Sequence, residues 1–251
     1  MDEIRISHVS KSYTTLSTDL VIGNAKRPSR TRKVLEDVNL AFPAGQLSVL
    51  VGRSGCGKST LLKMLAGKES PDSGEISLPH GWHAALLSPE SYVITWTNVR
   101  QNVAMASGVG KTPEERYEHA LEYVRLVGLE DCADLSPVEL STGMKQRLGL
   151  ARVLASQAEL LLMDEPFASL DFITRAELQN QVLQLQKNMP RTIVLVTHQL
   201  DEALLLGQSV TVMHELGKTE TFDLSHIPYP RDLSSPELLR LREAVTEACR
   251  R

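Results

Sequence analysis

The sequence is poor in the features that mark several large classes of protein. Its three cysteines, Cys56, Cys132 and Cys249, are too few and too scattered for a disulfide framework, so we expect a reducing compartment. No stretch approaches the roughly 18 consecutive apolar residues of a membrane span, and the first residues lack the apolar core of a secretory signal. The net charge of −4 provides no basic field, so we expect no nucleic-acid partner. Any membrane association is therefore expected to come through another protein.

The sequence does contain enough apolar residues for one large core, because 42% of its 251 residues are hydrophobic. Apolar runs at 47–51, 160–163 and 193–196 predict buried strands, and a helical pattern lies between the last two. This order of strand, helix and strand predicts a parallel sheet with right-handed crossovers. Weaker patterns predict further strands at 4–9, 38–42 and 75–78.

Three helices are predicted from their start signals. Thr112 opens a capping box, and the helix that follows should end near Gly128. A second helix should start at Ser141 and run to about Ala155. Ser235 caps a third helix, in the tail, which we expect to pack on the body of the protein; binding of a partner is the alternative.

The segment 14–33 is polar, and basic residues crowd its end. A solvated loop is the expected structure, and contact with lipid headgroups or a membrane subunit is the alternative. The basic residues are Lys26, Arg27, Arg30, Arg32 and Lys33.

A glycine-rich segment follows the strand at 47–51 and carries the first recognisable chemistry. It consists of Gly52, Arg53, Ser54, Gly55, Cys56, Gly57, Lys58, Ser59 and Thr60, and fits the phosphate-loop pattern. Its glycines let successive backbone N–H groups wrap a phosphate at the positive end of a helix. Lys58 is placed to reach the β- and γ-phosphates, and the Ser59 hydroxyl to bind Mg²⁺. The segment therefore predicts a nucleoside triphosphate site.

Two carboxylates close the strand at 160–163. Asp164 is placed to hold Mg²⁺, and Glu165 to polarise the attacking water as a general base. His198 follows the strand at 193–196. Because the carboxyl ends of parallel strands gather at one edge, we expect His198 beside Lys58 and Glu165, near the γ-phosphate. The catalytic candidates are therefore Glu165, His198 and Lys58.

These motifs, in this order, resemble those of the ATPase subunits of ABC transporters over nearly the whole chain. The phosphate loop is Walker A, residues 160–165 are Walker B, and His198 is the switch histidine. Tyr13 matches the aromatic residue that stacks on adenine. The family signature corresponds to Leu140, Ser141, Thr142, Gly143 and Met144, and the D-loop to Ser169, Leu170 and Asp171.

The resemblance implies an α/β fold of the P-loop NTPase type, in one ATPase domain over 1–251. Such a fold has a RecA-like parallel sheet core with an antiparallel β subdomain and an inserted α-helical subdomain. The core is expected at about 1–88 and 156–222, the helical subdomain at about 89–155, and a tail helix within 223–251.

The resemblance also implies ATP and Mg²⁺ as ligands and several protein partners. Two ATPase subunits, alike or paired, would sandwich two ATP molecules, with Ser141 and Gly143 facing the γ-phosphate held by the other subunit. Two transmembrane permease subunits and an extracytoplasmic solute-binding protein are the further partners. The expected location is peripheral, at the cytoplasmic face of the inner membrane.

Softer details resemble the nitrate, sulfonate and taurine importers. They are the signature continuation at 144–147, Trp96 with the segment 99–103, and the ending 229–237. This implies an ATP-hydrolysing importer subunit for a small anion. The alternatives are the ATPase of an exporter, and a non-transport ABC ATPase of DNA repair or translation.

Two positions depart from the family pattern. Thr142 replaces the first signature glycine while Gly143 is retained, so we expect a mild effect. Pro89 stands where the family carries a glutamine that touches Mg²⁺ and the attacking water, and proline supplies neither a side-chain amide nor an N–H. Ser88 or Glu90 could substitute. The hypothesis is that coupling to transport is altered while hydrolysis is kept.

Overall fold

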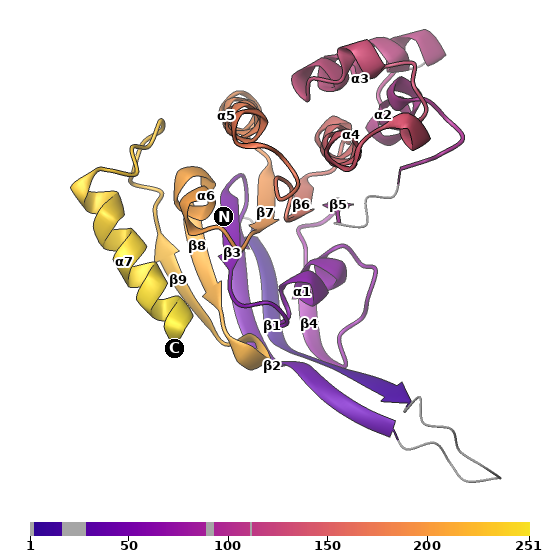
Figure 1. Cartoon of the computed structure of the whole chain (residues 1–251). Helices are drawn as coiled ribbons and strands as arrows, with labels where there is room; N and C mark the ends of the chain where they lie inside the picture. The colour runs from indigo at the N-terminus through magenta and orange to yellow at the C-terminus, as the bar shows by residue number, and fades with distance from the viewer. Residues whose placement is uncertain (1–2, 17–28, 89–92, 111) are drawn as a thin grey trace, which may run out of the picture.

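Two β-sheets, with helices packed around them, make up the chain (Figure 1). The structure is a computed structural model, and it describes residues 3–16, 29–88, 93–110 and 112–251. The sites and surfaces below are confined to these residues. None of the helices in them combines the length and the apolarity needed to cross a membrane.

The larger sheet has six strands in the order β5-β6-β7-β3-β8-β9. Neighbouring strands are parallel except for β8 and β9, which are antiparallel. Every residue of β3, β6 and β7 is buried, because both faces of the sheet are covered, and this explains why their sequences are mostly apolar. The parallel core predicted from the sequence is confirmed. The strands are β3 (Leu47–Val51), β5 (Ala84–Leu87), β6 (Leu160–Asp164), β7 (Thr192–Val196), β8 (Ser209–Met213) and β9 (Thr219–Asp223).

Helices cover the two faces of this sheet through alternate residues of its strands. Val49 and Leu161 point into the core that holds α5 (Phe172–Asn188) and α6 (Leu200–Leu206), whereas Leu50 points into the core that holds α1. Helix α1 (Lys58–Leu65) starts directly behind the glycine-rich segment. This period of two between faces is the pleat of a strand.

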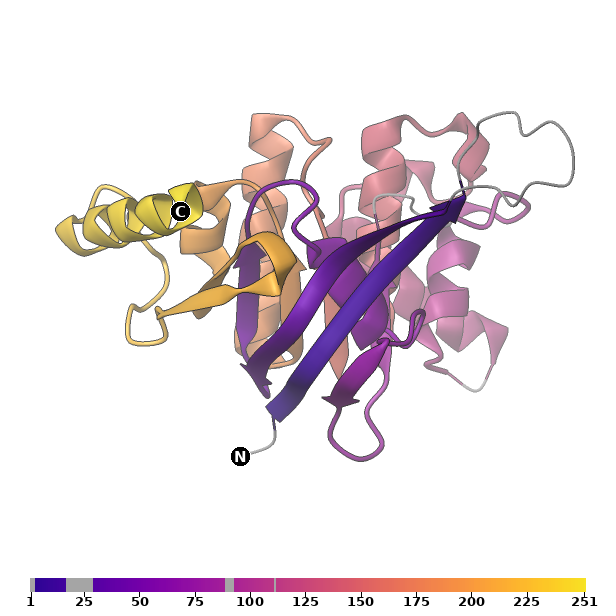
Figure 2. The ribbon, with the colours of Figure 1, turned by 90° about the horizontal axis from the view of Figure 1, so that it is seen from below.

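The smaller sheet is antiparallel, in the order β2-β1-β4, and it closes over α1. Seen from below, β1 and β2 form a long ribbon across the molecule (Figure 2). The strands are β1 (Glu3–Leu16), β2 (Ser29–Pro43) and β4 (Ser73–Ser77).

The expected loop at 14–33 is wrong at both of its ends. Residues 14–16 continue β1 and residues 29–33 begin β2, with Tyr13 paired to Arg32 and Thr14 to Thr31. The two polar strands form backbone hydrogen bonds with each other. A pattern of local hydrophobicity does not reveal such pairing, because the side chains involved are polar. Lys26 and Arg27 lie outside the described residues.

Three helices pack on one another beside the larger sheet: α2 (Val99–Ser107), α3 (Pro113–Leu126) and α4 (Thr142–Ala155). The predicted caps are confirmed. Thr112 accepts from the backbone N–H of Glu115 at 3.2 Å, and Ser141 from that of Met144 at 3.3 Å. Gly128 follows α3 with φ of 64°, the left-handed conformation that ends many helices. Short 3₁₀ turns occupy Glu130–Cys132, Pro137–Glu139 and Glu215–Gly217.

The tail helix, α7 (Pro236–Arg250), packs on the body as expected. Ser235 caps it, and Leu238, Val245 and Ala248 are buried against α6 and β8. The preceding segment is fixed by Arg231, whose guanidinium is buried and donates to main-chain carbonyls, including those of Leu204 at 2.8 Å and Leu224 at 2.9 Å. Burial lowers the pKa of Arg231.

Candidate functional site

A cavity of about 380 Å³ opens at the carboxyl edge of the parallel strands, against the glycine-rich loop. Lys58, Ser59, Asp164 and Glu165 line it, together with Ser54, Gly55, Gly57 and Thr60 of the loop. The edge position follows from the topology, because β3, β6 and β7 are neighbouring parallel strands that end side by side. The topology therefore brings the loop and the two carboxylates to one place.

The loop is pressed between two strands at positions where only glycine fits. A Cβ atom on Gly57 would lie 2.5 Å from Leu35 Cδ2 of β2, and Gly57 has φ of 109°. A Cβ atom on Gly52 would lie 2.2 Å from the carbonyl oxygen of Met213 in β8. The glycines thus serve the packing of the loop as well as the approach of a phosphate.

The Lys58 side chain is buried inside the loop. Its ammonium donates to the carbonyl oxygens of Gly52 at 2.7 Å and Arg53 at 3.0 Å. Ser59 contributes a hydroxyl oxygen to the cavity and Asp164 a carboxylate, and oxygen donors of this kind are the ligands that Mg²⁺ prefers. The donor set therefore fits Mg²⁺.

Part of the glycine-rich loop faces away from this cavity. Gly52, Arg53 and Cys56 line a separate cavity of about 400 Å³, together with Cys249 near the end of α7. The Cys56 thiol is buried, and its sulfur lies 3.8 Å from Lys58 Nζ. Arg53 and Cys56 are thus directed behind the loop, so contact with a phosphate would fall to their backbone N–H groups.

Glu165 and His198 lie together, as the strand register requires. Asp164 pairs with Val196 across β6 and β7, and the next residues bring His198 Nδ1 to 2.9 Å from both carboxylate oxygens of Glu165. Within the described residues, Glu165 is one of four non-glycine residues with positive φ, at 52°. Its backbone N–H donates to the Val196 carbonyl at 2.9 Å, which fixes this conformation from one side.

Tyr13 lies beside the first turn of α1. Its hydroxyl is 3.5 Å from Thr60 Oγ1 and also donates to Glu69, while the residue as a whole is 37% exposed. Burial, and then the hydrogen bond to Glu69, raise the pKa of Tyr13. An exposed ring next to the phosphate loop leaves one flat surface for a base.

Arg32 is a site residue that the sequence did not indicate. It lines the phosphate cavity, and its Nη2 atom is 3.4 Å from the carbonyl oxygen of Gly55. It reaches this place because β2 pairs it with Tyr13 of β1. No local motif marks such a position, since the neighbourhood arises from strand pairing.

The signature residues stand at the start of α4 and do not line the phosphate cavity. Ser141 and Thr142 are exposed, and Gly143 and Met144 are half-buried. The Ser141 hydroxyl accepts from the N–H of Met144, which leaves its own proton to donate. A Cβ atom on Gly143 would lie 3.3 Å from the Ser169 carbonyl oxygen, so the signature touches the D-loop.

The D-loop connects β6 to α5. Leu170 is buried, and Ser169 is exposed. Asp171 caps α5 by accepting from the N–H groups of Ile173 at 3.1 Å and Thr174 at 3.0 Å, and the bond from Thr174 lowers the pKa of Asp171. Pro89, the degenerate position in the sequence pattern, lies outside the described residues.

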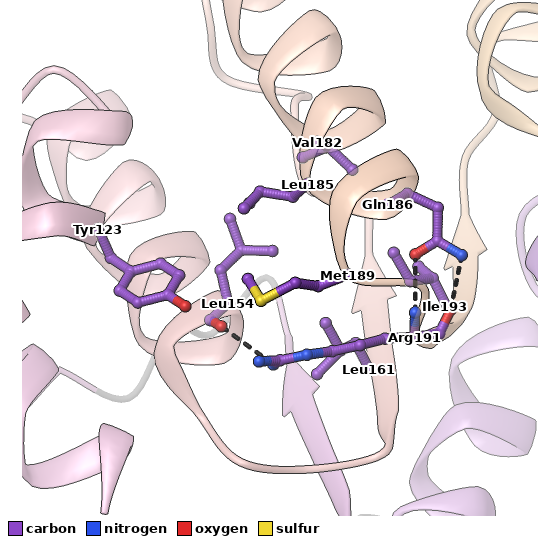
Figure 3. Close-up of a pocket in the computed structure, with 9 residues that line it drawn as sticks. All are labelled: Tyr123, Leu154, Leu161, Val182, Leu185, Gln186, Met189, Arg191 and Ile193. Carbon is purple, nitrogen blue, oxygen red and sulfur yellow. Dashed lines mark hydrogen bonds between the residues drawn. The ribbon is translucent and has the colours of Figure 1, made fainter. Parts of the chain in front are cut away.

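A further cavity, of about 20 Å³, lies between α5, the end of α4 and the starts of β6 and β7 (Figure 3). Its walls include Leu161, Val182 and Ile193, and the Arg191 guanidinium beside it donates to the Leu154 carbonyl at 3.1 Å. It is at the opposite edge of the sheet from Glu165 and is far too small for a nucleotide. We interpret it as a packing defect.

The comparisons with known proteins identify the family of this chain. The family model described as "ABC transporter" matches residues 35–168. The chain is 38% identical to the aliphatic sulfonates import ATP-binding protein SsuB 3 of Pseudomonas syringae pathovar tomato, over 90% of this chain and 84% of that protein. It is 38% identical to the taurine import ATP-binding protein TauB of Pseudomonas aeruginosa, over 79% of this chain and 78% of that protein.

Among solved structures, a dimeric post-hydrolysis state of the ATP-binding cassette MJ0796, bound to ADP and phosphate, is similar with a TM-score of 0.76. The match covers 88% of this chain and 98% of that chain at 24% identity, which shows the fold alone. The expected α/β fold of the P-loop NTPase type is thus confirmed. With the family match and the relatives above, the chain belongs to the ABC transporter family, as one of its ATP-hydrolysing subunits.

Proposed function

We propose that this chain hydrolyses ATP to ADP and phosphate in the cavity at the glycine-rich loop, and that this drives import through two permease subunits. The observation that carries the proposal is the convergence of Lys58, Ser59, Asp164 and Glu165 on one cavity, with His198 bonded to Glu165. Catalysis in such a site consists mainly of positioning and charge stabilisation.

Each residue has a distinct task in the reaction. Lys58 turns its ammonium from the loop carbonyls to the phosphate oxygens, since both are acceptors of the same kind. Ser59 and Asp164 would hold Mg²⁺, which neutralises phosphate charge when bound. Glu165 accepts a proton from the water that attacks the γ-phosphorus, while the bond from that phosphorus to the β-phosphate oxygen breaks. His198 holds the Glu165 carboxylate in place.

The active unit in this proposal is a pair of subunits. Ser141, Thr142, Gly143 and Met144 of the signature are absent from the walls of their own phosphate cavity and lie exposed or half-buried at the start of α4. The Ser141 hydroxyl and the positive end of α4 would meet the γ-phosphate of ATP held by the partner. Thr142 leaves this contact intact because Gly143 keeps the close approach.

Import of a small sulfonate such as taurine is the transport activity we propose. The relatives named above import aliphatic sulfonates and taurine, and the match to them covers most of this chain. Nitrate belongs to the same class of small anion. An extracytoplasmic solute-binding protein would deliver the anion, and the subunit would lie at the cytoplasmic face of the inner membrane. An exporter or a role in DNA repair or translation is disfavoured by this likeness.

Contact with the permease is supported by apolar side chains left in solvent near α2. Trp96 is 84% exposed just before the helix, and Met105 is 62% exposed within it. Large exposed apolar side chains of this kind mark interaction surfaces. Pro89 precedes this segment in the chain, and we propose that it changes how hydrolysis is passed to the permease.

The Glu165→Gln variant tests the proposed chemistry. General-base catalysis contributes about 10²- to 10⁴-fold, so ATP turnover should fall by at least about 100-fold. ATP binding should survive, and gel filtration with ATP and Mg²⁺ should show a stable dimer. Glu177→Gln, an exposed glutamate in α5, is the control that should behave as wild type. Turnover near wild type in Glu165→Gln would show that Glu165 is not the base.

A further inference from the structure

Gln146, in the second turn of α4, joins three functional segments through one side chain. Its Nε2 atom donates to the carbonyl oxygen of Glu165 at 2.6 Å. Its Oε1 atom accepts from the backbone N–H of Ser169 at 3.0 Å and from the Ser169 hydroxyl. A primary amide is well suited to this place, because it donates at one end and accepts at the other.

The bond to Glu165 acts on a backbone in an unfavourable conformation. Glu165 has φ of 52°, a backbone conformation that is unfavourable for residues other than glycine and persists only when the surrounding structure holds it. Two main-chain bonds hold it: its N–H donates to Val196, and its carbonyl accepts from Gln146. Val196 belongs to the parallel sheet, whereas Gln146 belongs to the signature helix. The direction of the Glu165 carboxylate therefore depends on where α4 stands.

The bond to Ser169 adds the D-loop to the same unit. Ser169 also meets the signature from the other side, since a Cβ atom on Gly143 would lie 3.3 Å from its carbonyl oxygen. The start of α4 thus contacts the D-loop at two points, through Gly143 and through Gln146. A shift of α4 must move Ser169 and Glu165 together or break these contacts.

We propose that Gln146 is a positioning residue that couples the two ATP sites of the dimer. The inference rests on the proposed function, in which the signature of one subunit binds ATP held by the partner while Glu165 acts on the subunit's own ATP. Gln146 connects these two events within one chain. ATP engaged by the signature fixes α4, and the amide of Gln146 then fixes the backbone of Glu165 in its reactive direction.

Three variants divide the amide into its parts. Gln146→Met keeps the length and removes both polar ends. Gln146→Glu keeps an acceptor for Ser169 but loses the donor and places a carboxylate against the carbonyl of Glu165. Ser169→Ala removes only the hydroxyl bond, because its backbone N–H remains. The donor to Glu165 is the part that the proposal requires, so Gln146→Glu should be as impaired as Gln146→Met.

The expected result is a change in turnover and cooperativity without a change in nucleotide binding. In Gln146→Met and Gln146→Glu, kcat should fall about tenfold, because both variants lose the hydrogen bond that positions the Glu165 backbone. The KM for ATP should stay within about twofold. The Hill coefficient for ATP should fall from near 2, the number of sites, toward 1. Ser169→Ala should lose no more than about threefold in kcat.

Gln186→Met is the matched control. Gln186 of α5 makes a bridge of the same kind. Its Nε2 atom donates to the Arg191 carbonyl at 2.7 Å and its Oε1 atom accepts from the Arg191 N–H at 3.1 Å (Figure 3). The Nε2 atom also donates to the Gly45 carbonyl at 2.8 Å. This bridge lies at the opposite edge of the sheet from Glu165. Gln186→Met should therefore lose stability as Gln146→Met does, and keep the wild-type kcat and Hill coefficient.

The outcomes separate this inference from the proposed function. A wild-type protein without ATPase activity would refute the proposed function itself. If the wild type hydrolyses ATP but has a Hill coefficient of 1, or if Gln146→Met matches it in kcat and cooperativity, only the coupling role is overturned. An equal loss of kcat and cooperativity in Gln186→Met would show that Gln146 has only a structural role, which also overturns the coupling role. If Gln146→Met does not fold, Gln146→Glu decides, and wild-type behaviour in that variant overturns the proposal.

Discussion

The left-handed backbone of Glu165 allows a prediction in which the usual ranking of alanine and glycine is reversed. Glu165→Ala and Glu165→Gly both remove the carboxylate and its bond to His198, and both keep the backbone bonds to Val196 and Gln146. The two variants differ only in the Cβ atom. Any difference in their stability therefore reflects two backbone terms, the strain at φ of 52° in the folded state and the conformational entropy of the unfolded chain.

The magnitude follows from two opposing terms. A residue with a Cβ atom pays about 1–2 kcal/mol to adopt the left-handed conformation. Glycine avoids this cost, but it loses about 0.5–1 kcal/mol more than alanine in backbone entropy on folding. The Gly variant should therefore be more stable than the Ala variant by about 0.5–1 kcal/mol. For a domain of this size the melting temperature should be higher by roughly 2 °C.

Urea and thermal unfolding of the nucleotide-free protein, followed by circular dichroism, measure this difference. Glu177→Ala and Glu177→Gly form the control pair, because Glu177 lies exposed inside α5. There the Ala variant should be the more stable by about 1 kcal/mol. If the Ala variant is more stable than the Gly variant at both positions, Glu165 is not held in the left-handed conformation, and Gln146 does not hold a strained backbone.

Two further predictions concern the adenine side of the site and a buried acid behind it. Tyr13→Ala should weaken the binding of a fluorescent ATP analogue by about tenfold, because the ring that stacks on the base is lost. Tyr13→Phe loses only the hydroxyl bonds to Thr60 and Glu69, so its affinity should stay within about twofold of wild type. Equal losses of affinity in the two variants would show that the hydroxyl, and not the ring, recognises the nucleotide. Glu202 is 4% exposed and accepts a hydrogen bond from Gln179 Nε2 at 2.8 Å. Burial raises the pKa of its carboxyl group, so this group stays protonated to higher pH in the folded state than in the unfolded state. Protonated Glu202 therefore stabilises the folded state fully below the pKa of the unfolded state, and this stabilisation is lost as pH rises through the pKa of the folded state. Glutamine stays neutral at every pH, so Glu202→Gln should be more stable than wild type against urea, by more at pH 8 than at pH 5. A gain of equal size at both pH values would contradict burial as the cause.

The features that the sequence predicted to the residue are those fixed by local hydrogen bonds. Thr112, Ser141 and Ser235 each cap a helix through a bond to a backbone N–H within three residues, so the pattern of residue types contains the whole interaction. The buried strands at 47–51, 160–163 and 193–196 were equally predictable, since a short segment that is almost entirely apolar requires cover on both faces.

The features that the sequence did not indicate depend on partners distant in the chain. Arg32 reaches the phosphate cavity through strand pairing with Tyr13, and Gln146 meets Glu165 and Ser169 only when α4 packs beside the sheet. Helix α6 has only seven residues and no side-chain cap at Gln199, so it lacks a local start signal. The motif residues are therefore predictable one by one, whereas the side chains that connect them are not.

The hydrogen bonds of Arg231 connect the tail to the body of the protein, and this affects how the protein unfolds. Its guanidinium donates to the carbonyls of Leu204 and Gly207 at the end of α6 and to that of Leu224 after β9. The charge is buried, so the tail cannot loosen bond by bond without leaving a cation in a poorly solvated place. We therefore expect this segment to open as a whole, together with α6 and the end of the sheet. The tail helix α7, although it lies at the end of the chain, is therefore expected to unfold together with the ATPase core.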